Sequence, residues 1–401
     1  MHDKLFFLSA LLLISCSGNK QDKGLTPWGQ VVTEEGIPEE TADTIGNSET
    51  FSLSDIINAG ELIMLTISSP ETYYDYHGHG MGLHYMMCEK LSQEIGVSLR
   101  VELCKDSLEM IEKLRKGEGD IVCYPISKKE IGKGSDFVSC GMKDDKGLSW
   151  IVRKSNEQLA SRADEWFKPE IIAKTRKEMT DILTTGYVKR HVYPFMISRK
   201  DAIISKYDYI FRKYAPVAGC DWTLIAAQCY QESCFDPNAK SWAGACGLMQ
   251  IIPSTASHLG LPLSDIYSPE ANVSAACRYM KELQGMFSEV DNRKERINFA
   301  LASYNGGYYH IKDAMALAKK YGKNPHRWSD VREFVLGLQS PQYYKDPVVK
   351  HGYMRGSETA GYVDKIIERW DDYRSATRGK FSSGTNAMPS PAKHKNKWDK
   401  N

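Results

Sequence analysis

Two different hydrophobic patterns follow one another along this 401-residue chain. From residue 51, apolar runs that are typical of strands alternate with amphipathic stretches that are typical of helices. We expect strands at 61–67, 98–103, 119–122 and 148–153, and helices at 83–95, at 106–116 and, after the last strand, to about residue 187. This alternation predicts a βαβ arrangement around a parallel sheet. From Ile204 onward helical patterns dominate, so the predicted fold class is α/β followed by mostly α.

The clearest helix of the second half follows Asp221, a residue that is favoured at helix N-caps. Its apolar positions repeat at i, i+3, i+4 and i+7, in the order Trp222, Ile225, Ala226 and Cys229. Glu232 comes where this pattern ends, and at ~100° per residue its side chain lies roughly 70° from the centre of the apolar stripe. We therefore expect a half-buried carboxyl at a helix end. The chain then turns through Asp236-Pro237-Asn238, and Pro253 starts the next helix.

Half burial would give Glu232 chemical significance. Desolvation raises the pKa of a carboxyl group, and a Glu that stays protonated near neutral pH can act as a general acid. The alternative is an ordinary helix-end carboxylate on the surface, which for a lone Glu is the better interpretation.

Glu232 belongs to the first of four short sequence motifs. They are Glu232-Ser233, Gly247-Leu248-Met249-Gln250, Ser303-Tyr304-Asn305-Gly306-Gly307 and Glu358-Thr359-Ala360-Gly361-Tyr362-Val363. Their order and separation resemble the Glu-Ser, GLMQ, AYNAG and ETxxYV motifs of the lysozyme-like lytic transglycosylases, over about residues 203–373. Ser303 and Gly306 are small departures from that pattern, since both positions are usually Ala. The resemblance implies a lysozyme-like catalytic domain at 199–373 that acts on peptidoglycan glycan strands.

The same resemblance implies a role for each motif residue. Glu232 would be the catalytic acid and base, cleaving between N-acetylmuramic acid and N-acetylglucosamine to give 1,6-anhydro products. The substrate-binding residues would be Ser233, Met249, Gln250, Tyr304, Asn305, Glu358 and Tyr362. A single acid suits a reaction whose nucleophile comes from the substrate, because most glycosidases need two carboxylates. Two alternatives remain open: a hydrolytic goose-type lysozyme on the same fold, and a non-catalytic wall-binding sensor lipoprotein.

The region at 51–198 resembles the first lobe of periplasmic solute-binding proteins of family 3. It has a Tyr- and Gly-rich loop at 73–78 and a Gly-Asp pair before the strand at 119–122. Residues 128–146 form only a short, polar, Gly-rich connection where that family places a second lobe. We therefore expect a single truncated lobe with a regulatory or scaffold role, for which muropeptides are a candidate ligand. This domain order resembles membrane-bound lytic transglycosylases of the F type. A metal site at His77, His79 and His84 is a minority interpretation, because the loop lacks ordered carboxylates or Cys.

The two ends of the chain differ in composition from the region between them. Leu13-Ile14-Ser15-Cys16 closes an apolar run of about ten residues, too short for a membrane span and typical of a signal peptide. It resembles a bacterial lipobox, which implies a signal peptide at 1–16, lipid attachment at Cys16 and an envelope location; a plain secretory signal is the alternative. Ser17 favours the outer membrane facing the periplasm, by resemblance to enterobacterial sorting. Residues 17–50 predict a flexible tether, and 374–401 a basic disordered tail.

Composition and charge limit the kinds of ligand and partner that the chain is expected to bind. A formal net charge of +1 gives no indication of nucleic-acid binding. Removal of Cys16 leaves nine cysteines, an odd number, so at least one stays free. If any pair exists, Cys234 and Cys246 are the candidates, whereas Cys229 and Cys277 on helical stripes are expected to be buried apolar residues. Without CxxC or a Cys/His cluster at zinc spacing, we expect neither a metal nor a cofactor.

Overall fold

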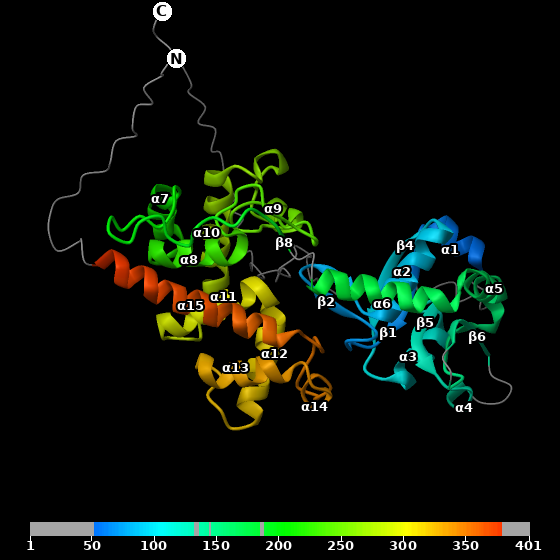
Figure 1. Cartoon of the computed structure of the whole chain (residues 1–401). Helices are drawn as coiled ribbons and strands as arrows, with labels where there is room; N and C mark the ends of the chain where they lie inside the picture. The colour runs from blue at the N-terminus through cyan, green and yellow to red at the C-terminus, as the bar shows by residue number, and fades with distance from the viewer. Residues whose placement is uncertain (1–51, 132–135, 144–145, 185–187, 379–401) are drawn as a thin grey trace, which may run out of the picture.

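The computed structural model describes residues 52–131, 136–143, 146–184 and 188–378. An α/β part and a mostly helical part lie side by side, with β2 (Tyr74–Tyr76) at the border between them (Figure 1). This arrangement confirms the predicted fold class. The predicted signal peptide, the lipid-attachment residue Cys16 and the tether at 17–50 lie outside the described residues.

The α/β part is built on a five-stranded sheet in the order β4-β1-β5-β7-β6. β1 pairs in parallel with β4 and β5, whereas β7 runs antiparallel to both β5 and β6. The strands are β1 (Glu61–Thr66), β3 (His79–Met81), β4 (Ser98–Leu103), β5 (Ile121–Ile126), β6 (Phe137–Lys143) and β7 (Ser149–Arg153), with β2 paired to β3 outside the sheet. The helices are α1 (Leu53–Ala59), α2 (Leu83–Ile95), α3 (Ser107–Lys116), α4 (Lys128–Ile131), α5 (Glu157–Trp166) and α6 (Pro169–Thr184). The predicted strands and helices of this part are confirmed.

Strand β6 was not predicted. Val138, Cys140 and Met142 alternate with Ser139, Gly141 and Lys143, but this short alternation lies in a segment that is otherwise polar and Gly-rich. The strand forms at the sheet edge because β7 supplies its hydrogen-bond partners. Between β5 and β7 the described residues form only α4 and β6, which is consistent with a single lobe.

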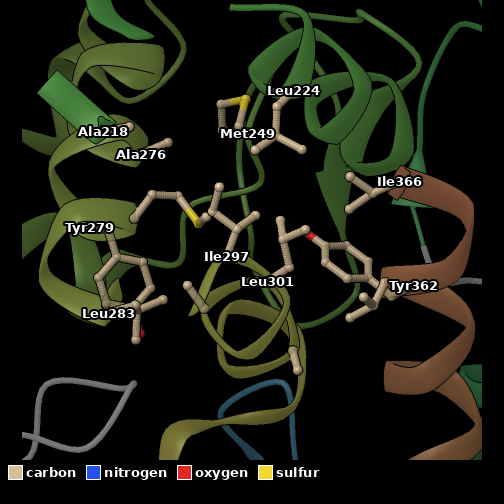
Figure 2. Close-up of a cluster of buried hydrophobic side chains, with 14 of the residues drawn as sticks. Ala218, Leu224, Met249, Ala276, Tyr279, Leu283, Ile297, Leu301, Tyr362 and Ile366 are labelled. Atoms are coloured by element: carbon tan, nitrogen blue, oxygen red, sulfur yellow. The ribbon is translucent and has the colours of Figure 1, made fainter. Parts of the chain in front are cut away.

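The helical part is organised around α8 (Trp222–Ser233). Most of this helix is inaccessible to solvent, and Leu224, Ile225, Ala226 and Ala227 are fully buried on successive positions, as expected for a helix enclosed on all sides. It packs against α7 and α15. Figure 2 shows part of this core, with Leu224, Leu301 and Ile366 directed toward a common centre. The helices are α7 (Asp208–Ala218), α9 (Pro253–His258), α10 (Pro269–Gly285), α11 (Arg293–Gly306), α12 (Tyr308–Lys320), α13 (Trp328–Gly337), α14 (Pro341–Tyr344) and α15 (Gly356–Arg378).

Two boundaries differ from the expected ones. The short strand β8 (Val188–Lys189) was expected within the front domain but pairs with β9 (Lys240–Ser241) of the helical part. The last helix continues to Arg378, so the prediction of a disordered tail from residue 374 is wrong for its first five residues. Helix α15 extends there because Thr377 is buried and its hydroxyl donates to the carbonyl of Tyr373. Among the residues that the structure describes, no helix combines the length and apolar character of a membrane span.

The suggested disulfide is wrong. All nine cysteines in the described ranges are free, including Cys234 and Cys246. Cys246 Sγ instead lies 3.2 Å from the carbonyl oxygen of Gly244 and 3.1 Å from the hydroxyl of Tyr267, and its single proton serves one of these contacts. Cys229 and Cys277 are fully buried, as predicted for small apolar residues.

Candidate active site

Glu232 lies in the last turn of α8, where the helix leaves the core. Asp221 caps the other end, its side chain accepting from the backbone N–H of Thr223. After the helix, Cys234 and Phe235 adopt φ values of 50° and 64°, in the left-handed region, and turn the chain sharply. The Glu232 side chain is half buried, as predicted.

The Glu232 carboxyl faces a cavity that is partly open to solvent. Four residues predicted for the site line it: Glu232, Gln250, Tyr304 and Asn305. The remaining lining residues were not predicted for this cavity, and they are His77, Ser241, Ala245, Ile251, Ile252, Thr255 and Tyr279. The cavity thus combines residues from three parts of the chain: the segment that follows α8, the end of α11, and the hairpin formed by β2 and β3. No pattern in the sequence indicates that Thr255 and Tyr279, on two later helices, face the same space.

Burial controls the protonation of Glu232. The pKa of Glu232 is raised to about 8, mainly by desolvation and to a lesser extent by the nearby carboxylate of Glu358. Two groups act in the opposite direction: the Tyr362 hydroxyl, which donates to Glu232 Oε1 at 2.5 Å, and Arg190, whose guanidinium donates to the Glu232 backbone carbonyl. Desolvation outweighs them, so Glu232 is protonated near neutral pH and can give up a proton to a ligand in the cavity.

Tyr362, Ser233 and Met249 lie behind the cavity wall. Tyr362 is 5% exposed and extends from α15 toward the core (Figure 2), so it touches Glu232 rather than open space. Ser233 is fully buried, and its hydroxyl donates to the carbonyl of Cys229. The expectation that the Met249 side chain faces a sugar is wrong. It is fully buried beside Leu224 in the core (Figure 2), because an apolar thioether packs better there than at a polar cavity.

The Gly247-Leu248-Met249-Gln250 segment shapes the cavity through its backbone. The Tyr304 hydroxyl donates to the Met249 carbonyl at 2.7 Å, which joins the end of α11 to this loop. The Gln250 side chain donates to the carbonyls of Ala239 and Gly247. At Gly247, φ is 78° and an added Cβ would lie 2.7 Å from the amide of Asn272, so only glycine fits.

Asn272 is a supporting residue that the sequence analysis missed. Fully buried on α10, its side chain accepts from the Met249 N–H and donates to the carbonyls of Cys246 and Ile266. One amide thus satisfies three backbone groups of the loop. A polar residue on the otherwise apolar face of this helix was the only indication in the sequence.

Glu358 lies in a neighbouring cavity, also partly open to solvent, which shares His77 and Asn305 with the first. Its carboxylate accepts from the Tyr76 hydroxyl at 3.0 Å and contacts His77 Nε2 at 2.8 Å. Burial would raise the pKa of Glu358, but the contacts with His77, Arg355 and Tyr76 hold it below its usual value. This acid therefore stays ionised and is engaged by the α/β part.

The β2–β3 hairpin of the α/β part reaches both walls of the site. His77 contacts α15 through Glu358, while His79 Nε2 lies 2.8 Å from the carbonyl of Ala243 and its ring lies 5.1 Å from that of Trp242. The third candidate histidine, His84, accepts a hydrogen bond from the indole of Trp150. The three histidines thus have separate partners, and the described part of the chain contains no cluster of three or more His, Cys, Asp or Glu side chains placed to hold a metal ion.

Sequence comparison identifies proteins that are similar to this chain. A sequence model described as the transglycosylase SLT domain matches residues 209–326. The membrane-bound lytic murein transglycosylase F of Desulfosudis oleivorans is 31% identical over 289 residues, which cover 70% of this chain and 62% of that protein. The protein of that name from Aeromonas hydrophila is 26% identical, covering 78% of this chain and 82% of the relative. One from Vibrio campbellii is 34% identical over 56% of this chain and 42% of its own length.

Two solved structures match separate parts. The 70 kDa soluble lytic transglycosylase SLT70 from Escherichia coli is 25% identical over 43% of this chain and 25% of its own, with a TM-score of 0.29. The arginine-bound form of domain 1 from TmArgBP is 15% identical over 30% of this chain and 97% of its own, with a TM-score of 0.25. The sequence matches carry the assignment: the chain contains a transglycosylase SLT domain and is related, over most of its length, to the membrane-bound lytic murein transglycosylases F.

Proposed function

We propose that the chain is a peptidoglycan lytic transglycosylase, which cleaves the β-1,4 bond between N-acetylmuramic acid and N-acetylglucosamine without hydrolysis. One observation carries the proposal. Among the described residues that line the cavity, Glu232 is the one carboxylic acid, and its pKa of about 8 keeps it protonated. The relatedness to lytic murein transglycosylases F supports the same substrate.

Glu232 acts twice in the proposed reaction. It first donates its proton to the glycosidic oxygen as the bond to C1 breaks. The resulting carboxylate then takes the proton of the muramoyl C6 hydroxyl while that oxygen attacks C1, which closes the 1,6-anhydro ring. The nucleophile is part of the bound sugar, so no water has to be recruited and no second carboxylate has to activate it. Glu358 is not available for that task, because Tyr76 and His77 engage its carboxylate.

The remaining lining residues are suited to hold the glycan. The hydroxyls of Ser241 and Thr255 and the amide of Asn305 are able to pair with sugar hydroxyls and N-acetyl groups. Tyr304 and Tyr279, whose rings lie 5.4 Å apart, add aromatic surface. Of the motif residues, Tyr304, Asn305 and Gln250 are proposed as direct substrate contacts, and Ser233 and Tyr362 as their support.

We also propose where the enzyme works. The relatives bear the name membrane-bound, and the lipobox-like segment at Cys16 supplies a means of attachment through lipid. Several acyl chains on one cysteine anchor a protein stably. The proposed location is therefore the cell envelope, at the outer membrane facing the periplasm, with the α/β part modulating the catalytic part.

The substitution Glu232→Gln tests the role of this acid. We expect lysis of purified cell wall to fall by at least the ~10²–10⁴-fold that general acid catalysis contributes, because an amide cannot donate and retake the proton. Glu282→Gln, which alters an exposed acid on α10, is the matched control and should retain full lysis. Substantial lysis by folded Glu232→Gln protein would show that another group is the acid, and no lysis by the unmodified protein would favour a sensor.

A further inference from the structure

A glutamine lies behind the catalytic carboxyl, one turn earlier on α8. Gln228 is fully buried, where an amide is costly unless its hydrogen bonds are made. Its Nε2 donates to the Tyr362 hydroxyl at 3.2 Å and lies 3.9 Å from Met280 Sδ, whereas its Oε1 has no hydrogen-bond partner. An unsatisfied amide oxygen in a core destabilises the fold.

The neighbours fix the direction of the hydrogen bonds. A thioether sulfur can only accept, so the proximity of Met280 Sδ sets the nitrogen of the Gln228 amide, and not its oxygen, on this side. The oxygen of Tyr362 therefore receives an N–H from Gln228. A phenol has a single proton, and with its oxygen occupied in this way the proton of Tyr362 is directed at Glu232 Oε1, 2.5 Å away.

We propose that Gln228 is a positioning residue that holds the Tyr362 hydroxyl as a permanent donor to Glu232 Oε1 and so keeps the acid proton on Oε2. Without it, Tyr362 would be free to rotate and accept the proton of Glu232 at Oε1, which would direct that proton into the core. When Gln228 is present, the proton of Glu232 cannot reside on Oε1. The Tyr362 O–H then remains available to stabilise the Glu232 carboxylate that acts as base. We call the hydrogen bonds from Gln228 to Tyr362 and from Tyr362 to Glu232 the relay. Its role in catalysis rests on the proposed function, whereas its geometry does not.

Other groups also act on the titration of Glu232, and a substitution of Gln228 alters the chemical identity of none of them. They are Tyr362 and Glu358 on α15, Tyr304 on α11, Cys229 on α8 and Arg190 next to β8. None of these charges changes in a Gln228 variant. A change in the titration of Glu232 would therefore report the hydrogen bond through Tyr362.

The test is Gln228→Leu, which keeps the helix and nearly the same volume. The titration of Glu232 is followed directly by NMR of the ¹³C-labelled carboxyl, and kcat and KM are measured against pH on soluble glycan strands. We expect the pKa of Glu232 to rise, because the neutral acid gains Tyr362 as an acceptor and the carboxylate loses a polarised donor. We expect kcat to fall with KM unchanged, since the proton is misplaced while the substrate contacts remain.

Two further variants separate the relay from packing. In a Tyr362→Phe background, Gln228→Leu should cause no additional shift, because the effect passes through the phenol. Gln284→Leu is the control: this half-buried glutamine on α10 donates to the carbonyls of Ala218 and Met280, and its loss should leave the Glu232 titration unmoved. Gln228→Met offers a second apolar replacement if the Leu variant folds poorly.

An unchanged Glu232 titration in folded Gln228→Leu or Gln228→Met protein would overturn the proposal. Additive shifts in the double variant would do the same. A shifted titration in a protein whose products carry no anhydro ends would leave the relay standing and contradict the proposed function alone.

Discussion

At the scale of single residues, the site depends on contacts between distant parts of the chain. The sequence was sufficient to predict that Glu232 ends a helix and is half buried, because both follow from a local apolar period. The hydrogen bond from Tyr362, 130 residues later, was not predictable, since no local rule fixes which side chain will meet it. Met249 was misplaced for the same reason: a motif names a residue but does not indicate whether its side chain or its backbone forms the cavity.

The raised pKa of Glu232 predicts a specific pH dependence. The acid works only while protonated, so kcat/KM should fall as pH rises through about 8. Because the folded-state pKa lies above its ordinary value of 4.5, ionisation of Glu232 also lowers the free energy of unfolding as pH rises between 4.5 and about 8. Glu232→Gln should remove that part of the pH dependence. An activity limb near the ordinary carboxyl pKa would contradict the burial argument.

At the scale of elements, the start of α15 sets the position of two site residues, Glu358 and Tyr362. The helix begins at Gly356, where an added Cβ would lie 1.7 Å from the carbonyl oxygen of Val335 on α13. Such an approach is possible only without a side chain. The helices were predicted from their periods, but this contact was not, and β6 was missed because its short alternation of Val138, Cys140 and Met142 lies in a polar, Gly-rich segment.

Substitutions at two glycines of α15 test this close approach. Gly356→Ala must push the helix away from α13, and overpacking of this kind costs about 1–3 kcal/mol or more of the free energy of unfolding. Gly361→Ala is the control in the same helix: nothing lies within 4 Å of its added Cβ, and Ala is favoured over Gly in helices by ~1 kcal/mol. Denaturant unfolding should give opposite signs for the two variants. Equal effects would mean that α15 is not held against α13 as described.

At the scale of the whole molecule, the helical part covers the edge of the sheet where a solute would bind. Ligands of open α/β sheets lie at the carboxyl ends of parallel strands, and here Ser68, just after β1, accepts from the backbone N–H of Tyr353 at 2.9 Å. Tyr353 also packs on Tyr74, and Gly352 closely approaches Ser68. The sequence indicated the missing second lobe, but not that another part of the chain would lie at that edge.

This cover predicts that the α/β part does not trap a free amino acid. Titration calorimetry with single amino acids should give no binding in the micromolar range, because the edge is occupied and the described residues form no second lobe over it. Cell-wall muropeptides, which are larger, serve as the comparison ligand. Micromolar binding of a free amino acid would mean that the contacts of Tyr353 open readily.

In the proposed reaction, Glu232 serves as both acid and base for a nucleophile carried by the substrate. Digestion of purified cell wall in heavy-oxygen water, followed by mass analysis of the new ends, tests it directly. We expect products that end in 1,6-anhydromuramic acid and carry no label, since no water enters the bond. Labelled reducing ends as the main product would contradict it and identify the enzyme as a hydrolase.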